Sequence, residues 1–352
     1  MQSWQFYYAF ALCTTCIFGG SSSAASTVPY KPSPAFNCSE PFRNVTALVY
    51  ADPNPDANFT LYTIQDYRNE LQAVYRLDLE PINIIPKLCN GSITKFPLMR
   101  HLKLVLTSIG DIEPGSFEDL PKLTHLDLSY NKLQVIDRYI FNNLPLTELR
   151  LAGNKIYNID PEAFDNMTSL ALLDLSFNKV QYMDEMWFKN TPKLTTLNFI
   201  YNLIPALEAH SFKHLEGTKM TVNLMFMNNS ITNIHRDAFK GLKSMGKLWL
   251  TGNKLRFIDD QLFNNVSAID ALNLEDNELF CLSERLLKDT RVKEIHLSGN
   301  PIICNCMTKL EQWSVQTNTK TYNSAKDLKR CGVSSRFIQT TTAKPEGVLV
   351  EL

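Results

Sequence analysis

The chain has 352 residues, a formal net charge of −1 and 44% hydrophobic residues. This length and composition allow a hydrophobic core of useful size. The near-zero charge lacks the strong basic bias of proteins that bind nucleic acids or anionic membranes, so we expect neither kind of partner.

Residues 1–24 have the composition of a secretory signal peptide. The apolar run FYYAFALCTTCIFGG is followed by SSSAAS, which supplies the small residues of a cleavage site. The alternative, a membrane anchor, is less favoured because the run is short and is interrupted by Thr14 and Thr15. We therefore expect Cys13 and Cys16 to be removed with the signal peptide, so their CxxC spacing marks neither a redox site nor a zinc site.

The rest of the chain has the marks of an extracellular glycoprotein. No 20-residue apolar span and no lipid-anchor signal occurs near the C-terminus, so we expect a secreted product without a membrane anchor. An even number of cysteines remains, which predicts disulfide bonds: Cys38, Cys89, Cys281, Cys304, Cys306 and Cys331. Seven Asn-x-Ser/Thr sequences are predicted glycosylation sites: Asn37, Asn44, Asn58, Asn90, Asn166, Asn228 and Asn265.

One spacing of apolar residues recurs from residue 99 to residue 302. In LTHLDLSYNKLQVIDRYIFNNL, residues 123–144, apolar residues fall at positions 1, 4, 6, 11, 14, 19 and 22, with Asn131 at position 9. Most steps between frames are 23 or 24 residues, and the step from 194 to 221 is 27. A weaker unit, VYRLDLEPINII from Val74, precedes them. The nine frames begin at Met99, Leu123, Leu146, Leu170, Leu194, Thr221, Met245, Ile269 and Val292.

This spacing resembles the consensus of the leucine-rich repeat family, LxxLxLxxNxLxxIxxxxFxxL. Position 9 is Asn in eight frames and Thr107 in the first, and position 19 is Phe in seven. The resemblance implies an α/β leucine-rich repeat solenoid with a curved parallel sheet on its concave face and a disulfide-stabilised cap at each end. Positions 4 and 6 would face inward from a short strand, and positions 11, 14 and 19 would fill the interior behind it. The position-9 amide would satisfy backbone groups in the turn after the strand.

The C-terminal end of the repeats is similar to the family's cysteine cap. NPIICNCMTKLEQWS matches NPxxCxC followed by a Trp, here Trp313. The family cap carries two further cysteines downstream, whereas only Cys331 follows here. We expect Cys281 to substitute, so that Cys281 and Cys331 pair with Cys304 and Cys306 in either order.

The N-terminal end lacks the clustered cysteines that are common in vertebrate extracellular members of the family. Cys38 and Cys89 would close a loop of about 50 residues, worth about 4 kcal/mol in the loop-entropy model. The segments VTALVY and FTLYTI are candidate cap strands. The predicted organisation is a signal peptide at 1–24, an N-terminal cap at 25–73, nine to ten repeats at 74–303, a C-terminal cysteine cap at 304–331 and a disordered tail at 332–352.

No sequence signature of catalysis occurs, since GxSxG, HExxH and P-loop motifs are all missing. We therefore predict that the protein is not an enzyme and needs no cofactor. His101 and His125 share position 3 of adjacent repeats, about 5 Å apart, and would suit a pH-sensitive or metal-binding pair. The favoured interpretation is two exposed residues on a variable face, and no metal site is predicted. Asp127, Arg150 and Asp174 share position 5 and predict a structural ion ladder.

The concave face carries apolar residues that the repeat itself does not require. Positions 5, 7 and 8 are expected to point out of this face. Contiguous exposed apolar area usually marks a contact, which predicts a binding surface for a protein partner. The alternative is that neighbouring rings merely cover the sheet. The predicted partner-binding residues are Tyr130, Phe177, Ile200, Tyr201, Met225, Met227 and Trp249.

The glycosylation sites constrain this surface. Asn228 occupies position 8, so a glycan there would stand on the concave face beside Met227 and Tyr201. It would restrict the ligand to one side or shift binding to a flank. Asn166 and Asn265 share position 21 and are predicted to lie on a common side away from the strands.

The unclustered N-terminal cap, Cys281 and the NPxxCxC end look similar to small secreted leucine-rich proteins of insects, including the leucine-rich immune proteins of mosquitoes. That resemblance implies a secreted recognition module of innate immunity, of the short type, because no heptads follow Cys331. The alternative is an extracellular matrix, cell-adhesion or developmental ligand resembling the ectodomains of Toll-like and axon-guidance proteins. The sequence names no ligand, and detectable turnover by the purified chain would contradict both interpretations.

Overall fold

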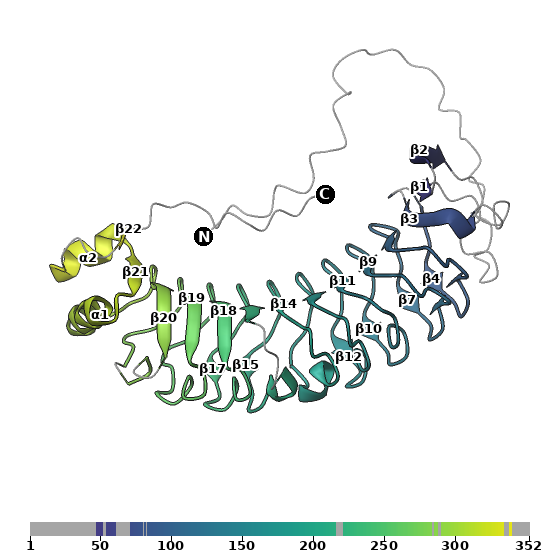
Figure 1. Cartoon of the computed structure of the whole chain (residues 1–352). Helices are drawn as coiled ribbons and strands as arrows, with labels where there is room; N and C mark the ends of the chain where they lie inside the picture. Colours follow the sequence, from purple (N-terminus) through teal and green to yellow (C-terminus); the bar gives the residue numbers. More distant parts are fainter. Residues whose placement is uncertain are drawn as a thin grey trace, which may run out of the picture. The chain divides into compact units, whose positions relative to one another are not determined.

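The computed structural model describes residues 47–51, 54–60, 71–79, 81, 83–215, 221–283, 285–287, 290–333 and 338–339. All of these belong to one unit, which spans Phe36–Leu352. The repeats coil into a solenoid whose strands line the inner, concave side of an arc (Figure 1). The predicted leucine-rich repeat solenoid is therefore confirmed.

A 14-stranded sheet runs along the concave side, and from β3 to β22 every neighbouring pair in it is parallel. Each predicted repeat contributes one strand, because positions 3 to 5 of the frame are extended in every turn. The order across the sheet is β2 (Asn54–Thr60), β1 (Ala47–Ala51), β3 (Val74–Leu79), β6 (His101–Lys103), β9 (His125–Asp127), β11 (Glu148–Arg150), β13 (Leu172–Asp174), β14 (Thr196–Asn198), β16 (Val222–Met225), β18 (Ser244–Trp249), β19 (Ala268–Asn273), β20 (Arg291–His296), β21 (Lys320–Asn323) and β22 (Ile338–Gln339).

Behind the sheet the chain returns through short pieces of regular structure. Three 3₁₀ turns are described: η2 (Leu71–Ala73), η3 (Glu185–Phe188) and η4 (Lys213–Leu215). Two-residue strands pair between neighbouring turns: β4 (Lys87–Leu88) with β7 (Asp111–Ile112), β5 (Ile93–Thr94) with β8 (Phe117–Glu118), β10 (Val135–Ile136) with β12 (Asn158–Ile159), and β15 (Ala206–Leu207) with β17 (Asn233–Ile234). Residues 216–220, within the longer repeat, lie outside the described part.

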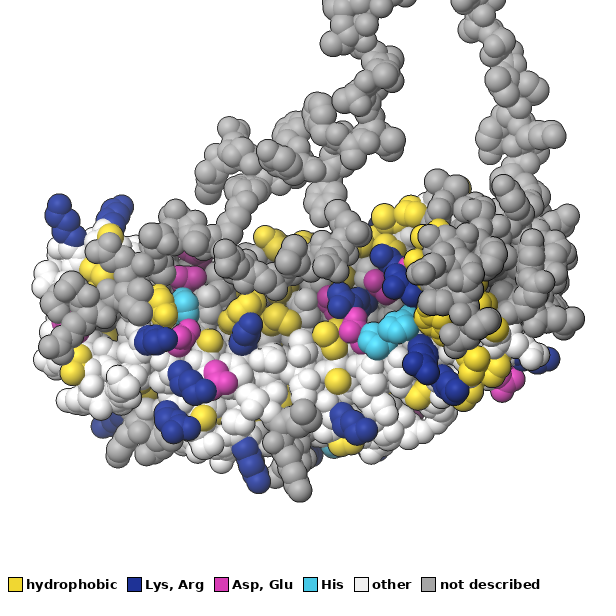
Figure 2. Space-filling view, turned by 45° about the horizontal axis from the view of Figure 1, so that its top comes forward, with side chains coloured by type: hydrophobic (Ala, Val, Ile, Leu, Met, Phe, Trp, Pro, Cys, Tyr) yellow, Lys and Arg dark blue, Asp and Glu magenta, His cyan; other side chains and the backbone are white. Residues whose placement is uncertain are grey.

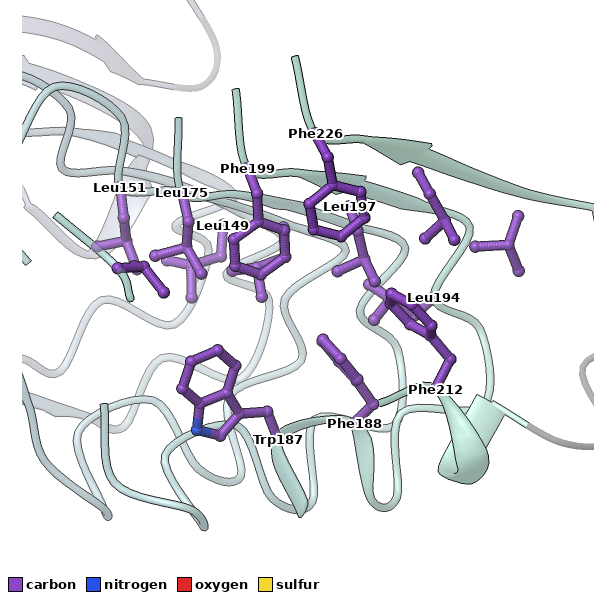
Figure 3. Packing of buried hydrophobic residues seen from close by; sticks show 14 of the residues in the cluster. Leu149, Leu151, Leu175, Trp187, Phe188, Leu194, Leu197, Phe199, Phe212 and Phe226 are labelled. Carbon is purple, nitrogen blue, oxygen red and sulfur yellow. The ribbon is translucent and has the colours of Figure 1, made fainter. Parts of the chain in front are cut away.

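Apolar side chains from both sides of each turn meet in the interior. The position-19 phenylalanines form a column, in which Phe212 stacks on Phe239 at 5.7 Å between ring centroids and Phe239 on Phe263 at 6.0 Å. Trp187 and Phe188 of η3 reach toward Phe199 on the strand side (Figure 3). Trp187, which the consensus does not predict, is 1% exposed and stacks on Phe199 at 6.4 Å. Burying each such ring stabilises the fold by about 1.5–3 kcal/mol.

The position-9 asparagines join each turn to the one before it. Asn178 donates through Nδ2 to the carbonyl oxygens of Leu175 in its own repeat (3.0 Å) and Leu151 in the preceding one (2.9 Å). Its Oδ1 accepts the backbone N–H of Ile156 at 2.9 Å. This confirms the predicted role of the amide. Where Thr107 replaces Asn, its hydroxyl donates to the carbonyl oxygen of Leu104 at 3.2 Å.

The N-terminal end of the sheet is an antiparallel addition. Strand β1 pairs antiparallel with both β2 and β3, so the first repeat is covered by a hairpin instead of another turn. β1 coincides with the VTALVY segment, whereas β2 precedes most of FTLYTI. Cys89 is buried and disulfide-bonded. Its predicted partner Cys38 and the predicted signal peptide lie outside the described residues.

The C-terminal cap is built from α1 (Cys304–Thr317), β21, α2 (Ala325–Cys331) and β22. The disulfides join Cys281 to Cys306 and Cys304 to Cys331, which settles the order that the sequence left open. Strand β22 adds Ile338–Gln339 to the sheet, inside the segment for which a disordered tail was predicted, so the cap extends past that boundary. Within the described residues, no helix combines the length and apolar character needed to span a bilayer.

Candidate functional site

One backbone angle is shared by all nine repeats just after the strand. At position 8 of every frame φ is positive, in the left-handed region that favours glycine. Glycine, Asn or Asp fills five of the nine positions, but bulky apolar residues fill the other four. The nine residues are Leu106, Tyr130, Gly153, Phe177, Tyr201, Asn228, Gly252, Asp276 and Gly299.

Position-8 side chains interact with those of the next repeat. The rings of Phe177 and Tyr201 stack at 4.7 Å between centroids with an interplanar angle of 21°. Tyr130 lies over Gly153, where a Cβ atom would sit 2.5 Å from Tyr130 Cδ1. Asn228 covers Gly252 in the same way. After Tyr130, Phe177 and Asn228, the next repeat therefore stacks a ring on the side chain or makes room for it.

The predicted partner-binding residues differ in how exposed they are. Phe177 and Tyr201 are 43% and 50% exposed and form the most accessible part of the surface. Four further residues are half-buried: Met225 on β16, Met227 just after it, Trp249 on β18, and Tyr130 toward the N-terminal end. Lys247 places Nζ 4.9 Å from the centroid of the Trp249 ring. Hydrophobic side chains are visible near the middle of this face in Figure 2. We call Phe177, Tyr201, Met225, Met227 and Trp249 the central patch.

The prediction for Ile200 is wrong, since this side chain is only 5% exposed. The cause lies in the turn. Asn198 Oδ1 accepts the backbone N–H of Ile200 at 3.1 Å, which draws position 7 in against the strand. Asp127 and Asp174 accept the N–H groups of the position-7 residues Ser129 and Ser176 in the same way, both at 2.9 Å.

These bonds differ from the predicted ion ladder, in which Asp127, Arg150 and Asp174 would interact with one another. Asp127 and Asp174 are engaged by backbone N–H groups, and Arg150 pairs directly with Glu148 on its own strand. Burial raises the pKa of Asp174 above its ordinary value, while its bonds to Ser176 and the charge of Arg150 act against that rise.

A second feature of the concave face lies toward the N-terminal end. His101 and His125, aligned on β6 and β9, stack at 4.3 Å between ring centroids with an interplanar angle of 25°. His101 is half-buried, so the expectation of two independent exposed residues is not met. Burial lowers the pKa of His101, and the neighbouring His125 and Arg76 lower it further.

The two imidazoles line a shallow depression of about 560 Å³ across β3, β6, β9 and β11. Figure 2 shows histidine side chains beside basic and acidic ones on this face. Sequence reasoning missed Arg76, Asp78, Lys103 and Glu148. The repeat frame offered a signal, because counting from Val74 places Arg76 at position 3 and Asp78 at position 5, and the register pairs them with His101 and Lys103. We call this feature the N-terminal depression.

The described residues include no group of three or more His, Cys, Asp or Glu side chains placed to hold a metal ion. The predicted glycosylation sites differ in their surroundings. Asn90, Asn166 and Asn265 are exposed, and Asn228 is half-buried on the concave row. Asn58 lies in β2, while Asn37 and Asn44 lie outside the described residues.

Two family models match the chain in the region of these repeats. The "BspA type Leucine rich repeat region" matches residues 99–219 in six copies, and "Leucine rich repeat" matches residues 221–279. Together they cover about half of the chain.

Curated proteins with similar sequences include some whose names state that they contain leucine-rich repeats. The human "Leucine-rich repeats and immunoglobulin-like domains protein 1" is 30% identical over 49% of this chain. "Trophoblast glycoprotein" of Macaca fascicularis is 26% identical over 84% of it, and "Tsukushi" of Gallus gallus 25% over 64%. The chain spans 16% of the length of the first relative and 63% of each of the other two.

Solved structures with a similar fold come from protein complexes. A chain of the mouse RP105/MD-1 complex aligns with a TM-score of 0.57 and 25% identity, covering 67% of this chain and 40% of that one. A chain of the octameric complex of Latrophilin 3, Unc5D and FLRT2 aligns with a TM-score of 0.50 and 25% identity, covering 57% and 60%.

Proposed function

The chain belongs to the leucine-rich repeat protein family, and from this premise we propose that it is an extracellular recognition module that binds a protein partner through the central patch of its concave face. Similarity to chains found in complexes of extracellular proteins supports this proposal. We propose no catalytic role, and turnover of a substrate by the purified chain would contradict this.

The exposed stack of Phe177 on Tyr201 is the observation that carries the proposal. Both residues have left-handed φ values, 55° and 54°, a conformation that costs a side-chain-bearing residue about 1–2 kcal/mol. The fold does not require rings there, because Gly153 and Gly252 serve the same position in other repeats. Aromatic rings held in a strained and exposed place are typical of contact surfaces.

For the biological role we propose innate immune recognition. Its support is the resemblance of the caps to short secreted leucine-rich proteins of insects, namely the unclustered N-terminal cysteines and the NPxxCxC end. A rise in the amount of this protein in extracellular fluid after infection is the expected result.

A second role, in the matrix, in cell adhesion or in developmental signalling, has its own support. The chain is similar to Tsukushi, to Trophoblast glycoprotein and to a chain from the complex of Latrophilin 3, Unc5D and FLRT2. Constant expression restricted to epithelium or nerve, without a response to infection, would favour this role over immunity.

Replacing both rings by glycine tests the contact without straining the backbone. Immobilised full-length chain captures partners from native extracellular fluid, and each candidate is then purified and titrated against the wild type and the Phe177→Gly/Tyr201→Gly variant. Glycine suits the left-handed angle, so the gain in backbone energy offsets the lost ring stack of about 0.5–1.5 kcal/mol and the thermal midpoint should change little. Affinity should fall at least about tenfold.

Phe257→Ala is the matched control, because Phe257 is 64% exposed but lies outside the strand region. This variant should bind the partner as the wild type does. Unchanged affinity of the double-glycine variant, with its secretion and thermal midpoint intact, would refute the central patch as the binding surface.

A further inference from the structure

The N-terminal depression is electrically balanced apart from its two histidines. Three cationic side chains line it, from Arg76, Lys103 and Arg150, and three carboxylates, from Asp78, Asp127 and Glu148. Their formal charges cancel, so the charge of this surface follows the protonation of His101 and His125. The surface is neutral when both imidazoles are neutral and carries up to two positive charges when both are protonated.

The geometry ties the two imidazoles to each other and to the surrounding charges. His125 Nδ1 lies 2.9 Å from Thr124 Oγ1, and its Nε2 lies 4.0 Å from Glu148 Oε2. Its other neighbour is the stacked ring of His101. The charged groups around the pair are Arg76 and Asp78 on β3, Lys103 on β6, Asp127 on β9, and Glu148 and Arg150 on β11. Arg100, beside β6 and outside the balanced lining, adds one positive charge that does not depend on the histidines.

Two of the three cationic side chains already pair with carboxylates of the same chain. Arg76 donates through Nε to Asp78 Oδ1 at 3.0 Å, and Arg150 pairs with Glu148. Lys103 forms no ion pair with any described residue. A carboxylate arriving from outside would therefore meet Lys103 and the imidazoles first, and it would be attracted chiefly when those imidazoles are charged.

We propose that the N-terminal depression is a pH-dependent contact surface that binds an acidic segment of a protein partner when the His101–His125 pair is protonated. The class of partner follows from charge complementarity, because protonation changes a neutral surface into one with two added positive charges. The depression is open and extends across four strands, so an extended segment fits it better than a compact small molecule. It lies on β3 to β11, separate from the central patch on β13 to β18, and does not depend on the function proposed for that patch.

Burial lowers the pKa of His101, so its imidazole is uncharged in the stack at neutral pH. As the pH falls below the ordinary histidine value of about 6.5, protonation places like charges in contact, and a bound carboxylate relieves their repulsion.

A fluorescein-labelled octaglutamate peptide is a suitable probe, since glutamate with a pKa of about 4.3 stays ionised at pH 5.5. Fluorescence anisotropy with the full-length chain in low salt should show affinity about tenfold higher at pH 5.5 than at pH 7.4. The midpoint of this change should coincide with the titration of the His101 and His125 ring protons followed by NMR.

Two variants separate this surface from the rest of the chain. His101→Gln/His125→Gln should bind the peptide with the same affinity at both pH values, and His125→Gln alone should show a reduced pH dependence. His235→Gln is the matched control, because His235 lies on the far side of its repeat beside Asp237, and it should behave as the wild type. Phe177→Gly/Tyr201→Gly should also leave peptide binding unchanged.

Equal peptide affinity at the two pH values in the wild type would overturn the proposal, and so would pH-dependent binding that persists in the double histidine variant. Binding of a heparin tetrasaccharide at pH 5.5 without binding of the peptide would overturn the assignment to a protein segment.

Discussion

At position 8 of each repeat, a single dihedral angle decides which residues the backbone accepts and where their side chains go. Nine consecutive turns share a positive φ there. Two of the large residues show how the next repeat can accommodate them: Tyr201 stacks its ring on Phe177, and Gly153 has no side chain beneath Tyr130. Glycine at position 153 is thus favoured both by the Tyr130 ring of the preceding repeat and by the positive φ.

Gly153→Ala should therefore be strongly destabilising. The left-handed angle of 67° costs alanine about 1 kcal/mol, and a Cβ 2.5 Å from Tyr130 Cδ1 adds about 1–3 kcal/mol of overpacking. We expect the free energy of unfolding, measured by urea denaturation, to fall by about 2–4 kcal/mol.

The double variant Tyr130→Ala/Gly153→Ala isolates the steric part. Removing the Tyr130 ring should recover most of the free energy lost to overpacking and leave the cost of alanine in the left-handed region. Gly110→Ala is the matched control, because its nearest neighbour, the Pro86 carbonyl oxygen, is 3.6 Å from the added Cβ and its φ is not left-handed. A Gly153→Ala loss no larger than that of Gly110→Ala would contradict this account.

At the scale of the element, one turn of the solenoid cannot bury its own apolar face, and its asparagine bonds to the turn before it. The last turn has no following turn to cover its apolar side chains, so the C-terminal cap covers them instead. Helix α1 supplies the apolar side chains of Cys306, Met307, Leu310 and Trp313 to the open end of the interior. The Cys281–Cys306 bridge ties this helix to the turn that begins at Ile269.

Removing this bridge should loosen the cap before the repeats. With a sequence separation of 25 between the cysteines, the loop-entropy model predicts that Cys281→Ser/Cys306→Ala loses about 3.5 kcal/mol of stability. Hydrogen exchange followed by mass spectrometry should show lost protection in α1 and in the last two repeats, because a solenoid unfolds locally from a weakened end.

The repeats that carry β6 to β14 provide an internal control in the same experiment, and their protection should not change. An equal loss of protection along the whole solenoid would show that the bridge stabilises the chain as one cooperative unit, contrary to this expectation.

At the scale of the whole molecule, the repeat spacing was enough to predict the solenoid, its parallel sheet and its interior. These follow from stacking, which forces apolar residues such as Phe212 and turn asparagines such as Asn178 into fixed positions. The concave face was predicted less completely. Ile200 is buried because Asn198 bonds its N–H, a contact between side chain and turn that apolar spacing does not encode.

The N-terminal depression was missed for a related reason. Its charges come from four strands, and the weakest frame, at Val74, supplies two of them. The pairing of the cap cysteines was also beyond the sequence, because Cys304 and Cys306 stand two residues apart and the approach of α1 to the last repeat selects between them.

The stability of the whole chain should depend on pH through two half-buried histidines. Burial lowers the pKa of His101 and of His296, which stacks on Tyr322 at 4.2 Å. The unfolded chain then binds more protons than the folded one as the pH falls, so stability present above about pH 6.5 is lost as the pH falls through the folded-state pKa values. Thermal midpoints should decrease from pH 7.5 to pH 5.5, and less so in His296→Gln.

Asp174 acts in the opposite direction, since burial raises its pKa and its protonation favours the folded state as the pH falls. In Asp174→Asn the midpoint should therefore fall more steeply than in the wild type as the pH is lowered further, to the ordinary aspartate value of about 3.9. A wild-type midpoint that stays constant from pH 7.5 to pH 5.5 would contradict the sign derived for the histidines.

The same measurement connects stability to the N-terminal depression. A ligand that binds only the folded state raises its stability by RT ln(1 + [L]/Kd), so acidic peptide at pH 5.5 should raise the midpoint of the wild type more than the same peptide concentration does at pH 7.4. His296 lies on β20, at the opposite end of the sheet, so His296→Gln should show the same rise. A peptide that raises neither midpoint would show that the pH dependence of stability is unrelated to ligand binding.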